Sequence, residues 1–266
     1  MPSQRLGEIE IHYQIRGVGP PVLLVPGLSL DLHVFDAVVD RLEDRCTCVA
    51  LDNRGAGRSD APRGPYSMRD LAGDLFGLLT VLGVERAVVV GHSMGGYAAL
   101  QLALDSPEVV AGLVLLSSSP TGRPRELGSS PEAAAALART RGSLESIVRG
   151  NASASFGGRF RAERPDDFDR FVAARLEHPP RGRGVAGQRA AARGFDVRDR
   201  LWEVTCPAVV VHGADDRLVA PARGEELAAG IGGARLVRLQ RVGHMPQVEA
   251  ADATAEAILS VVDRAG

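Results

Sequence analysis

The segment AVVVGHSMG, residues 87–95, decides the fold of this chain. Its first four residues are typical of a buried strand, and a helical pattern follows from about residue 94 to residue 105. The pattern G-x-S-x-G at such a junction makes a sharp turn that lifts the serine hydroxyl out of the sheet. We therefore predict that Ser93 is a nucleophile and that the backbone N–H of Met94 points toward a developing oxyanion.

The rest of the chain alternates short apolar runs with helical patterns. We expect further strands at 8–15, 22–25, 46–51, 112–116, 208–211 and 235–239, and further helices at 67–82, 225–229 and 250–262. Strands that alternate with helices of this length indicate an α/β fold, in which helices flank a mostly parallel, twisted sheet.

A different pattern fills residues 119–204, where short helical stretches alternate with Gly-, Pro- and Arg-rich stretches. We predict a helical cap here, set into an α/β core made of residues 1–118 and 205–266. Phe168, Phe171 and Leu176 could form one apolar helix face that packs on this core. Alternatively, aromatic side chains of the cap line an apolar pocket in which an arginine meets an anionic substrate group.

Composition narrows the range of partners. The formal net charge of −2 over 266 residues gives no basic face for nucleic acid. The N-terminal residues lack the basic start and apolar run of a signal peptide, and no apolar run is long enough to span a membrane. The three cysteines have neither disulfide nor metal spacing, which favours core positions. We expect a cytoplasmic protein; oligomeric state is left open.

Five motifs together resemble the α/β-hydrolase superfamily: VPGL at 25–28, DxRGxGxS at 52–59, GHSMG at 91–95, HGxxD at 212–216 and GH at 243–244. Residues 29–36 and 60–84 are also similar to 3-oxoadipate enol-lactonases and related small esterases. The resemblance implies the α/β-hydrolase fold, with a helical lid inserted after the sixth strand.

The resemblance also implies a catalytic triad in the chain order Ser, Asp, His. His244 follows the last strand, where the family carries its general base. Asp216, three residues after Gly213, is the acid that orients the histidine, and Asp215 is the alternative. Some relatives place the acid after the sixth strand, but residues 117–119 are all serine and supply no carboxylate. His212 is expected to be structural.

The second oxyanion donor is expected to be the backbone N–H of Leu28, in the loop after the strand at 22–25. This loop has Pro26-Gly27 where relatives commonly have His-Gly, and the change leaves a backbone donor in place. The glycine-rich stretch at 52–59 lacks the pattern of a phosphate-binding loop, and the chain contains no lysine. We expect no cofactor and no metal.

The predicted reaction is hydrolysis of a small-molecule carboxylic ester or lactone through an acyl-enzyme on Ser93. A carbon–carbon bond (β-ketolase-type) hydrolase, or a cofactor-free perhydrolase or haloperoxidase, would use the same three residues. A ligand-binding receptor or a cyclase on the same fold is an alternative from another class, because a fold does not fix a function.

Overall fold

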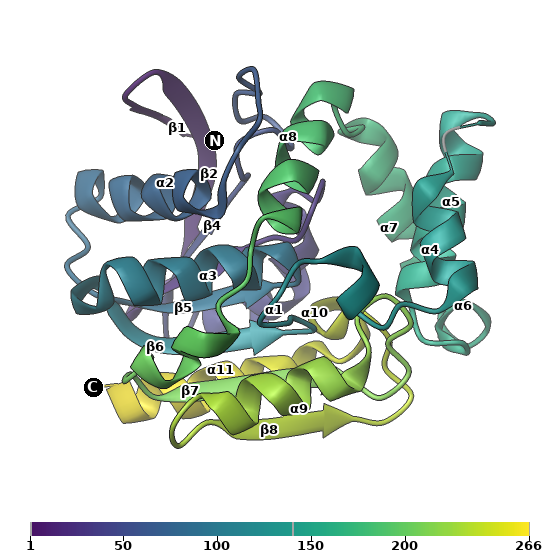
Figure 1. Cartoon of the computed structure of the whole chain (residues 1–266). Helices are drawn as coiled ribbons and strands as arrows, with labels where there is room; N and C mark the ends of the chain where they lie inside the picture. Colours follow the sequence, from purple (N-terminus) through teal and green to yellow (C-terminus); the bar gives the residue numbers. More distant parts are fainter. Residues whose placement is uncertain (1, 140, 266) are drawn as a thin grey trace.

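The computed structural model describes residues 2–139 and 141–265 and contains one eight-stranded sheet, in the order β1-β2-β4-β3-β5-β6-β7-β8 (Figure 1). The strands are β1 (Ser3–Leu6), β2 (Ile9–Arg16), β3 (Pro21–Val25), β4 (Thr47–Leu51), β5 (Ala87–His92), β6 (Val110–Leu116), β7 (Ala208–Gly213) and β8 (Arg235–Leu239). Strand β2 runs antiparallel to both β1 and β4, and the other pairs are parallel. The predicted, mostly parallel sheet is confirmed; the edge strand β1 was not predicted.

Side chains that alternate along the strands fill two separate apolar layers. Leu23 and Val25 of β3 face the layer formed with α2 (Met68–Val81), α3 (Met94–Asp105) and α9 (Pro221–Gly230). Val22 and Leu24 face the layer formed with α1 (Asp36–Leu42) and α11 (Ala251–Ala265). Burial on both faces explains why the parallel strands are continuous apolar runs. The predicted α/β-hydrolase sheet flanked by helices is therefore confirmed.

Helix α2 shows how local sequence sets an element. Its leucines recur at helical spacing and are buried, as the sequence predicted. The Ser67 hydroxyl accepts a hydrogen bond from the Asp70 N–H, and the Asp70 carboxylate accepts one from the Ser67 N–H. This reciprocal capping box satisfies two backbone donors that a helix start leaves free.

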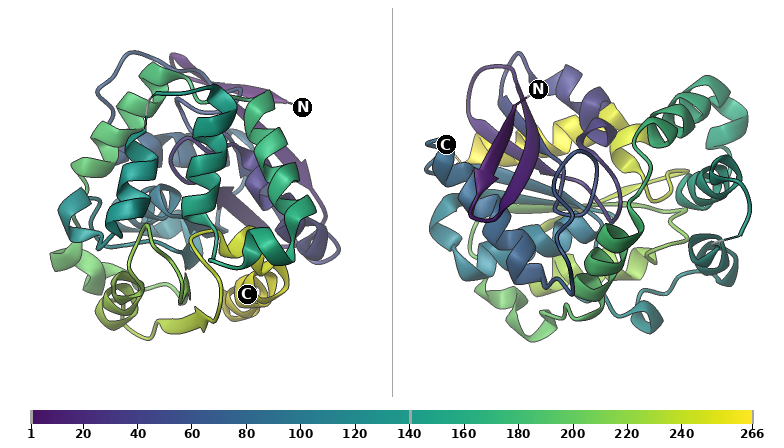
Figure 2. Two further views of the ribbon diagram at one scale, coloured as in Figure 1. Left: turned by 90° about the vertical axis from the view of Figure 1, so that its right-hand side faces the viewer. Right: turned by 90° about the horizontal axis from the view of Figure 1, so that it is seen from above.

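Between β6 and β7 the chain forms α4 (Pro131–Ala138), α5 (Leu144–Ser155), α6 (Phe160–Glu163), α7 (Pro165–Glu177) and α8 (Gly182–Arg193). Figures 1 and 2 show α4–α7 grouped at the end of the molecule toward which the parallel strands point. Phe156 stacks on Phe160 at 4.3 Å between ring centroids and meets Phe171 edge-on at 5.0 Å. With buried Phe168 they join the apolar layer of α1 and α11. These phenylalanines therefore pack the helices onto the sheet.

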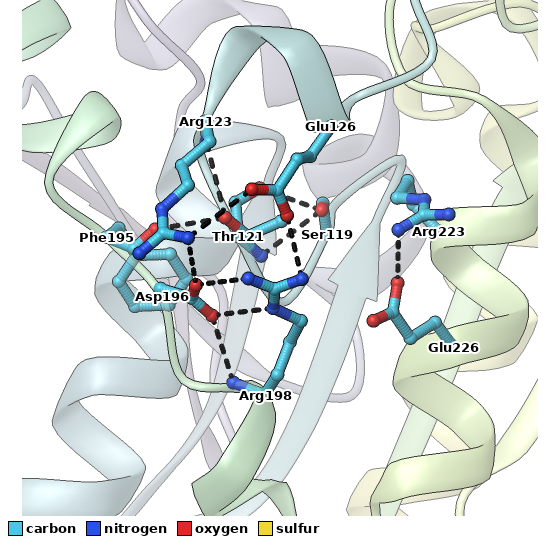
Figure 3. A network of polar contacts seen from close by, with 9 residues as sticks. All are labelled: Ser119, Thr121, Arg123, Glu126, Phe195, Asp196, Arg198, Arg223 and Glu226. Atoms are coloured by element: carbon cyan, nitrogen blue, oxygen red, sulfur yellow. Dashed lines mark hydrogen bonds and ion pairs between the residues drawn. The ribbon is translucent and has the colours of Figure 1, made fainter.

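The two ends of this helical segment are bonded to each other (Figure 3). Thr121 and Asp196 form an isolated antiparallel bridge. Arg198 pairs with Glu126 at 2.7 Å and with Asp196 at 2.5 Å, and Arg123 lies 3.3 Å from Asp196. The segment that follows β6 (residues 121–126) and the segment that leads to β7 (residues 196–198) are thereby held side by side.

Two further expectations concern the membrane and the cysteines. Across residues 2–139 and 141–265, no helix has the length and apolar character needed to cross a membrane. Cys46 and Cys48 are buried, as predicted, and Cys206 is partly buried; all three are free thiols. Burial raises the pKa of Cys48 to about 12, which keeps that thiol protonated and unreactive.

Candidate active site

Ser93 stands at a strained turn between β5 and α3. Its backbone has φ 52° and ψ −118°, a left-handed conformation that non-glycine residues rarely adopt. A Cβ at Gly91 would lie 2.5 Å from the carbonyl oxygen of Gly95, and a Cβ at Gly95 would collide with the carbonyl oxygen of Val25. Only glycine fits at these two positions, and the turn leaves Ser93 partly exposed. Strain of this kind is common at catalytic residues.

Asp216 follows β7 and is buried against His244. One carboxylate oxygen accepts hydrogen bonds from the backbone N–H groups of Leu218 and Val219, both at 2.9 Å. The other lies 2.8 Å from Nδ1 of His244. Burial raises the pKa of Asp216, but the neighbouring His244 and His212 outweigh burial and hold that pKa below its usual value. Asp216 is therefore ionised and acts as an acceptor only.

The competing carboxylate, Asp215, is exposed, and among the described residues it is Asp216 that pairs with His244. The backbone N–H of Asp215 donates to the carbonyl oxygen of Val242 at 2.9 Å, which ties the loop after β7 to the loop that carries His244. Of the two aspartates that the sequence left in competition, the fold brings Asp216 to the histidine.

The contact with Asp216 sets the tautomer of His244. A carboxylate can only accept, so Nδ1 of His244 carries the proton and Nε2 is left as the basic nitrogen. His92, the residue before Ser93 in the serine turn, donates a hydrogen bond from its Nε2 to the backbone carbonyl oxygen of His244 at 2.8 Å. The centroids of the two imidazole rings lie 5.0 Å apart. Because His92 directly precedes Ser93, these contacts bring the His244 loop to the serine turn.

Two other buried histidines support the site. Burial lowers the pKa of His92 to about 3, so its ring is neutral and its Nε2–H is a permanent donor. His212, expected to be structural, directs Nε2 to the Val219 carbonyl at 3.0 Å and lies 3.3 Å from the Asp216 carboxylate. His212 thus holds the loop that carries Asp216 in place, through a contact that the sequence did not predict.

Two backbone donors lie beside the serine turn. Within the described residues, neither the Leu28 N–H nor the Met94 N–H has an acceptor in the protein. A Cβ on Gly27 would lie 2.8 Å from Nδ1 of His92, so the loop before Leu28 packs directly on the turn. Asn53 donates to the carbonyl oxygen of Pro26 at 2.8 Å and fixes the start of this loop. The two free N–H groups can therefore serve a negatively charged oxygen.

Glu249 was not predicted as a site residue, yet it holds the His244 loop. Its carboxylate accepts hydrogen bonds from the N–H groups of Gly243 and Met245, on either side of His244, at 3.0 and 3.2 Å. It also accepts from the N–H of Gly157, in the 119–204 segment, at 2.8 Å. Burial raises the pKa of Glu249 to about 7, against the lowering effect of these hydrogen bonds.

No group of three or more His, Cys, Asp or Glu side chains that could hold a metal ion was found in the part of the chain that the structure describes. The site brings together a serine at a strained turn, a histidine paired with a carboxylate, and two backbone N–H groups without an acceptor. Groups of these kinds can carry out acyl transfer.

Known proteins share this architecture. The sequence profile of the alpha/beta hydrolase fold family matches residues 20–251. The chain is 30% identical to a 2-(acetamidomethylene)succinate hydrolase of Mesorhizobium japonicum, over 82% of this chain and 78% of that protein. It superposes on the enol-lactonase from Burkholderia xenovorans LB400 with a TM-score of 0.87 and 28% identity, over 98% and 100% of the two chains. Est816, an N-acyl homoserine lactone degrading enzyme, gives a TM-score of 0.84 at 30% identity, over 97% and 99%. This chain therefore belongs to the alpha/beta hydrolase fold family and is a hydrolase.

Proposed function

We propose that this hydrolase cleaves a small-molecule carboxylic ester or lactone through an acyl-enzyme on Ser93. The observation that carries the proposal is the pairing of His244 with the buried, ionised Asp216, which leaves Nε2 of His244 as a base beside the strained serine turn. A serine hydroxyl becomes an effective nucleophile only when such a base takes its proton.

The reaction has two halves that use the same groups. Ser93 Oγ attacks the substrate carbonyl while its proton passes to Nε2 of His244, and Asp216 stabilises the resulting imidazolium. The N–H groups of Leu28 and Met94 stabilise the tetrahedral oxyanion. His244 then gives its proton to the leaving alcohol. A water molecule, deprotonated by His244, attacks the acyl-enzyme, and His244 returns this proton to Ser93 Oγ as the acid is released.

We further propose that residues 119–204 form the cap over this site, on a core of residues 1–118 and 205–266. Helices α4–α7 lie at the carboxyl ends of the strands, the edge at which open α/β sheets bind ligands. The enol-lactonase and the lactone-degrading enzyme among the similar structures favour lactones as the first substrates to test. The succinate named in the related hydrolase makes carboxylated substrates the second class.

The test combines fluorophosphonate labelling with turnover of a panel of p-nitrophenyl esters and lactones. The proposal predicts stoichiometric labelling of the wild-type protein, none of Ser93→Ala, and turnover of at least one lactone or ester. Labelling without turnover across the panel would favour a carbon–carbon bond hydrolase or a receptor-like role. Absence of labelling in the folded wild-type protein would contradict the proposed nucleophile.

A further inference from the structure

Ser29, which follows the proposed oxyanion donor Leu28, is held on both sides by side chains of the 119–204 segment. Its backbone N–H donates to Oε1 of Gln188, on α8, at 2.8 Å. Its carbonyl oxygen accepts from the guanidinium of Arg175, on α7, at 2.6 Å. Side chains from two helices more than a hundred residues away along the chain thus hydrogen-bond to both backbone groups of one residue in the loop that follows β3.

The backbone conformation of Ser29 explains why these two hydrogen bonds are needed. Residues 27–30 form a turn closed by the N–H of Leu30 and the carbonyl oxygen of Gly27 at 3.1 Å. Ser29 is the third residue of this turn and has φ 62°, the position and sign that type II turns reserve for glycine or asparagine. A serine there is strained, and it needs contacts that hold the turn closed.

The same turn sets the direction of the Leu28 N–H. The carbonyl of Gly27 and the N–H of Leu28 belong to one planar peptide unit and point in opposite directions. When the Gly27 carbonyl is directed at Leu30, the Leu28 N–H must point away from the interior of the turn. If the turn opens at Ser29, the peptide unit is free to rotate and the donor is lost.

The side chains of Gln188 and Arg175 are both buried and both have further partners in the core. Gln188 is fully buried, and its amide nitrogen also donates to the carbonyl oxygen of Arg54 at 2.8 Å, so it joins two loops of the core. Arg175 is 7% exposed and lies 3.6 Å from the carboxylate of Asp31. Burying a guanidinium is costly unless it is paired and hydrogen-bonded. Both side chains therefore have defined partners and little freedom to move.

We propose that Gln188 and Arg175 are positioning residues that complete the oxyanion hole. By holding Ser29 in its left-handed conformation they direct the Leu28 N–H at the substrate, so the hole is complete only while α7 and α8 are seated on the core. The inference rests on the proposed function, because it takes Leu28 as an oxyanion donor. It goes further in giving the 119–204 segment a part in transition-state stabilisation as well as in covering the site.

The test measures kcat, KM and the inhibition constant of a trifluoromethyl ketone, which adds to the serine as a tetrahedral oxyanion. The variants are Gln188→Leu, which removes both hydrogen bonds at similar volume, and the milder Arg175→Lys. We expect kcat to fall about 10- to 100-fold in Gln188→Leu with KM changed less than threefold, a smaller loss than the roughly 10²- to 10³-fold that follows outright removal of an oxyanion donor. The ketone should bind more weakly by the same factor as kcat/KM falls. Arg175→Lys should show the same pattern with a smaller loss.

Matched controls lie on the same two helices. Arg193→Gln on α8 and Arg170→Gln on α7 change exposed arginines and should leave kcat, KM and ketone binding unchanged. Adding Ser29→Gly to Gln188→Leu should restore part of kcat, because glycine adopts φ near 62° without strain. This rescue distinguishes an effect through Ser29 from general damage to the fold.

The outcomes separate the inference from the function on which it rests. Unchanged kcat and ketone binding in Gln188→Leu, with Ser93 still labelled by fluorophosphonate, would overturn the inference and leave the proposed function standing. A rise in KM alone would also overturn it, since that result assigns Gln188 to substrate binding. If Gln188→Leu does not fold, Arg175→Lys decides by the same criteria. Absence of labelling in the wild-type protein would remove the proposed function itself.

Discussion

The backbone N–H of His244 donates a hydrogen bond of 2.6 Å to the carbonyl oxygen of Ser155, in the last turn of α5. This contact joins the proposed base to the segment between β6 and β7. Gly243 packs so closely there that a Cβ would lie 2.6 Å from the carbonyl carbon of Phe156. The 119–204 segment therefore holds the His244 loop through α5 and the Leu28 loop through α7 and α8.

The first prediction concerns the acid. Asp216→Asn keeps an oxygen for the N–H groups of Leu218 and Val219 but turns an amide NH₂ toward Nδ1 of His244. The histidine then loses both its favoured tautomer and the charge that stabilises its protonated form. We expect kcat to fall about 10³- to 10⁴-fold with the fold intact. Steady-state kinetics with Asp215→Asn as the matched control tests this, and an equal loss in both variants would refute the assignment.

The second prediction concerns the serine turn. In Gly95→Ala the added methyl group would collide with the carbonyl oxygen of Val25, in the strand beside β5. We expect a destabilisation of about 1–3 kcal/mol, typical of overpacking in a core, and loss of the hydrolase activity. Gly150→Ala is the control: it lies inside α5 with no atom within 4 Å of the new Cβ, and should be neutral or stabilising by up to about 1 kcal/mol. Urea titration measures both, and similar changes in the two proteins would contradict the prediction.

The third prediction concerns pH. The pKa of Glu249 is raised to about 7 in the folded protein from an ordinary value of 4.5. Between these two pH values the folded protein keeps a proton that the unfolded chain has released, so the free energy of unfolding falls as pH rises. Relative to Glu249→Gln, wild type should lose about 2–3 kcal/mol between pH 4.5 and pH 8, and change little below pH 4.

Chemical unfolding across this pH range tests the prediction for Glu249. Titratable groups that wild type and Glu249→Gln share cancel in the difference between their free energies of unfolding. The difference therefore reports on the Glu249 carboxyl alone. Glu256→Gln, at an exposed position on α11, is the matched control for removal of one surface carboxyl. No change in the Glu249→Gln difference between pH 4.5 and pH 8 would mean that burial does not destabilise the ionised form of this carboxyl.

The fourth prediction concerns the loop that Gln188 contacts. Arg54 forms a two-pronged ion pair with buried Asp74, at 2.6 and 2.7 Å. Asp74→Ala leaves the half-buried guanidinium without its partner, so we expect a loss of about 2–3 kcal/mol in the free energy of unfolding. Asp70→Ala removes a more exposed carboxylate, 3.9 Å from Arg54, together with its part in the capping box of α2, and should still cost less, about 1 kcal/mol. Equal losses would show that burial of the pair is not the cause.

The sequence predicted the parts of this molecule whose signals are local. The serine turn, the buried strands and α2 each depend on residues close together in the chain, and each lies where it was expected. The edge strand β1 was missed because its four residues alternate between exposed and half-buried and carry no apolar run. The short helix α1 was not predicted either.

The contacts that support the site could not be predicted in the same way. Glu249 binds the N–H of Gly157, and Gln188 binds the N–H of Ser29, and in both pairs one partner is a backbone group. Every residue type except proline offers the same N–H, so the sequence of the partner carries no signal. The sequence also left open whether the aromatic residues of the 119–204 segment pack on the core or line an apolar pocket. Phe195 stacks on Tyr97 of the core, and Trp202 is 73% exposed.

An acyl-enzyme on Ser93 is tested most directly by rapid-quench mass spectrometry of the protein mixed with a p-nitrophenyl ester that it turns over. An acyl-enzyme on Ser93 predicts that the intact mass rises by one acyl group within the first turnover, and that the modified peptide contains residue 93. Ser93→Ala should show no adduct. An ester hydrolysed at full rate with no adduct at any quench time, or an adduct that persists in Ser93→Ala, would contradict an acyl-enzyme on Ser93.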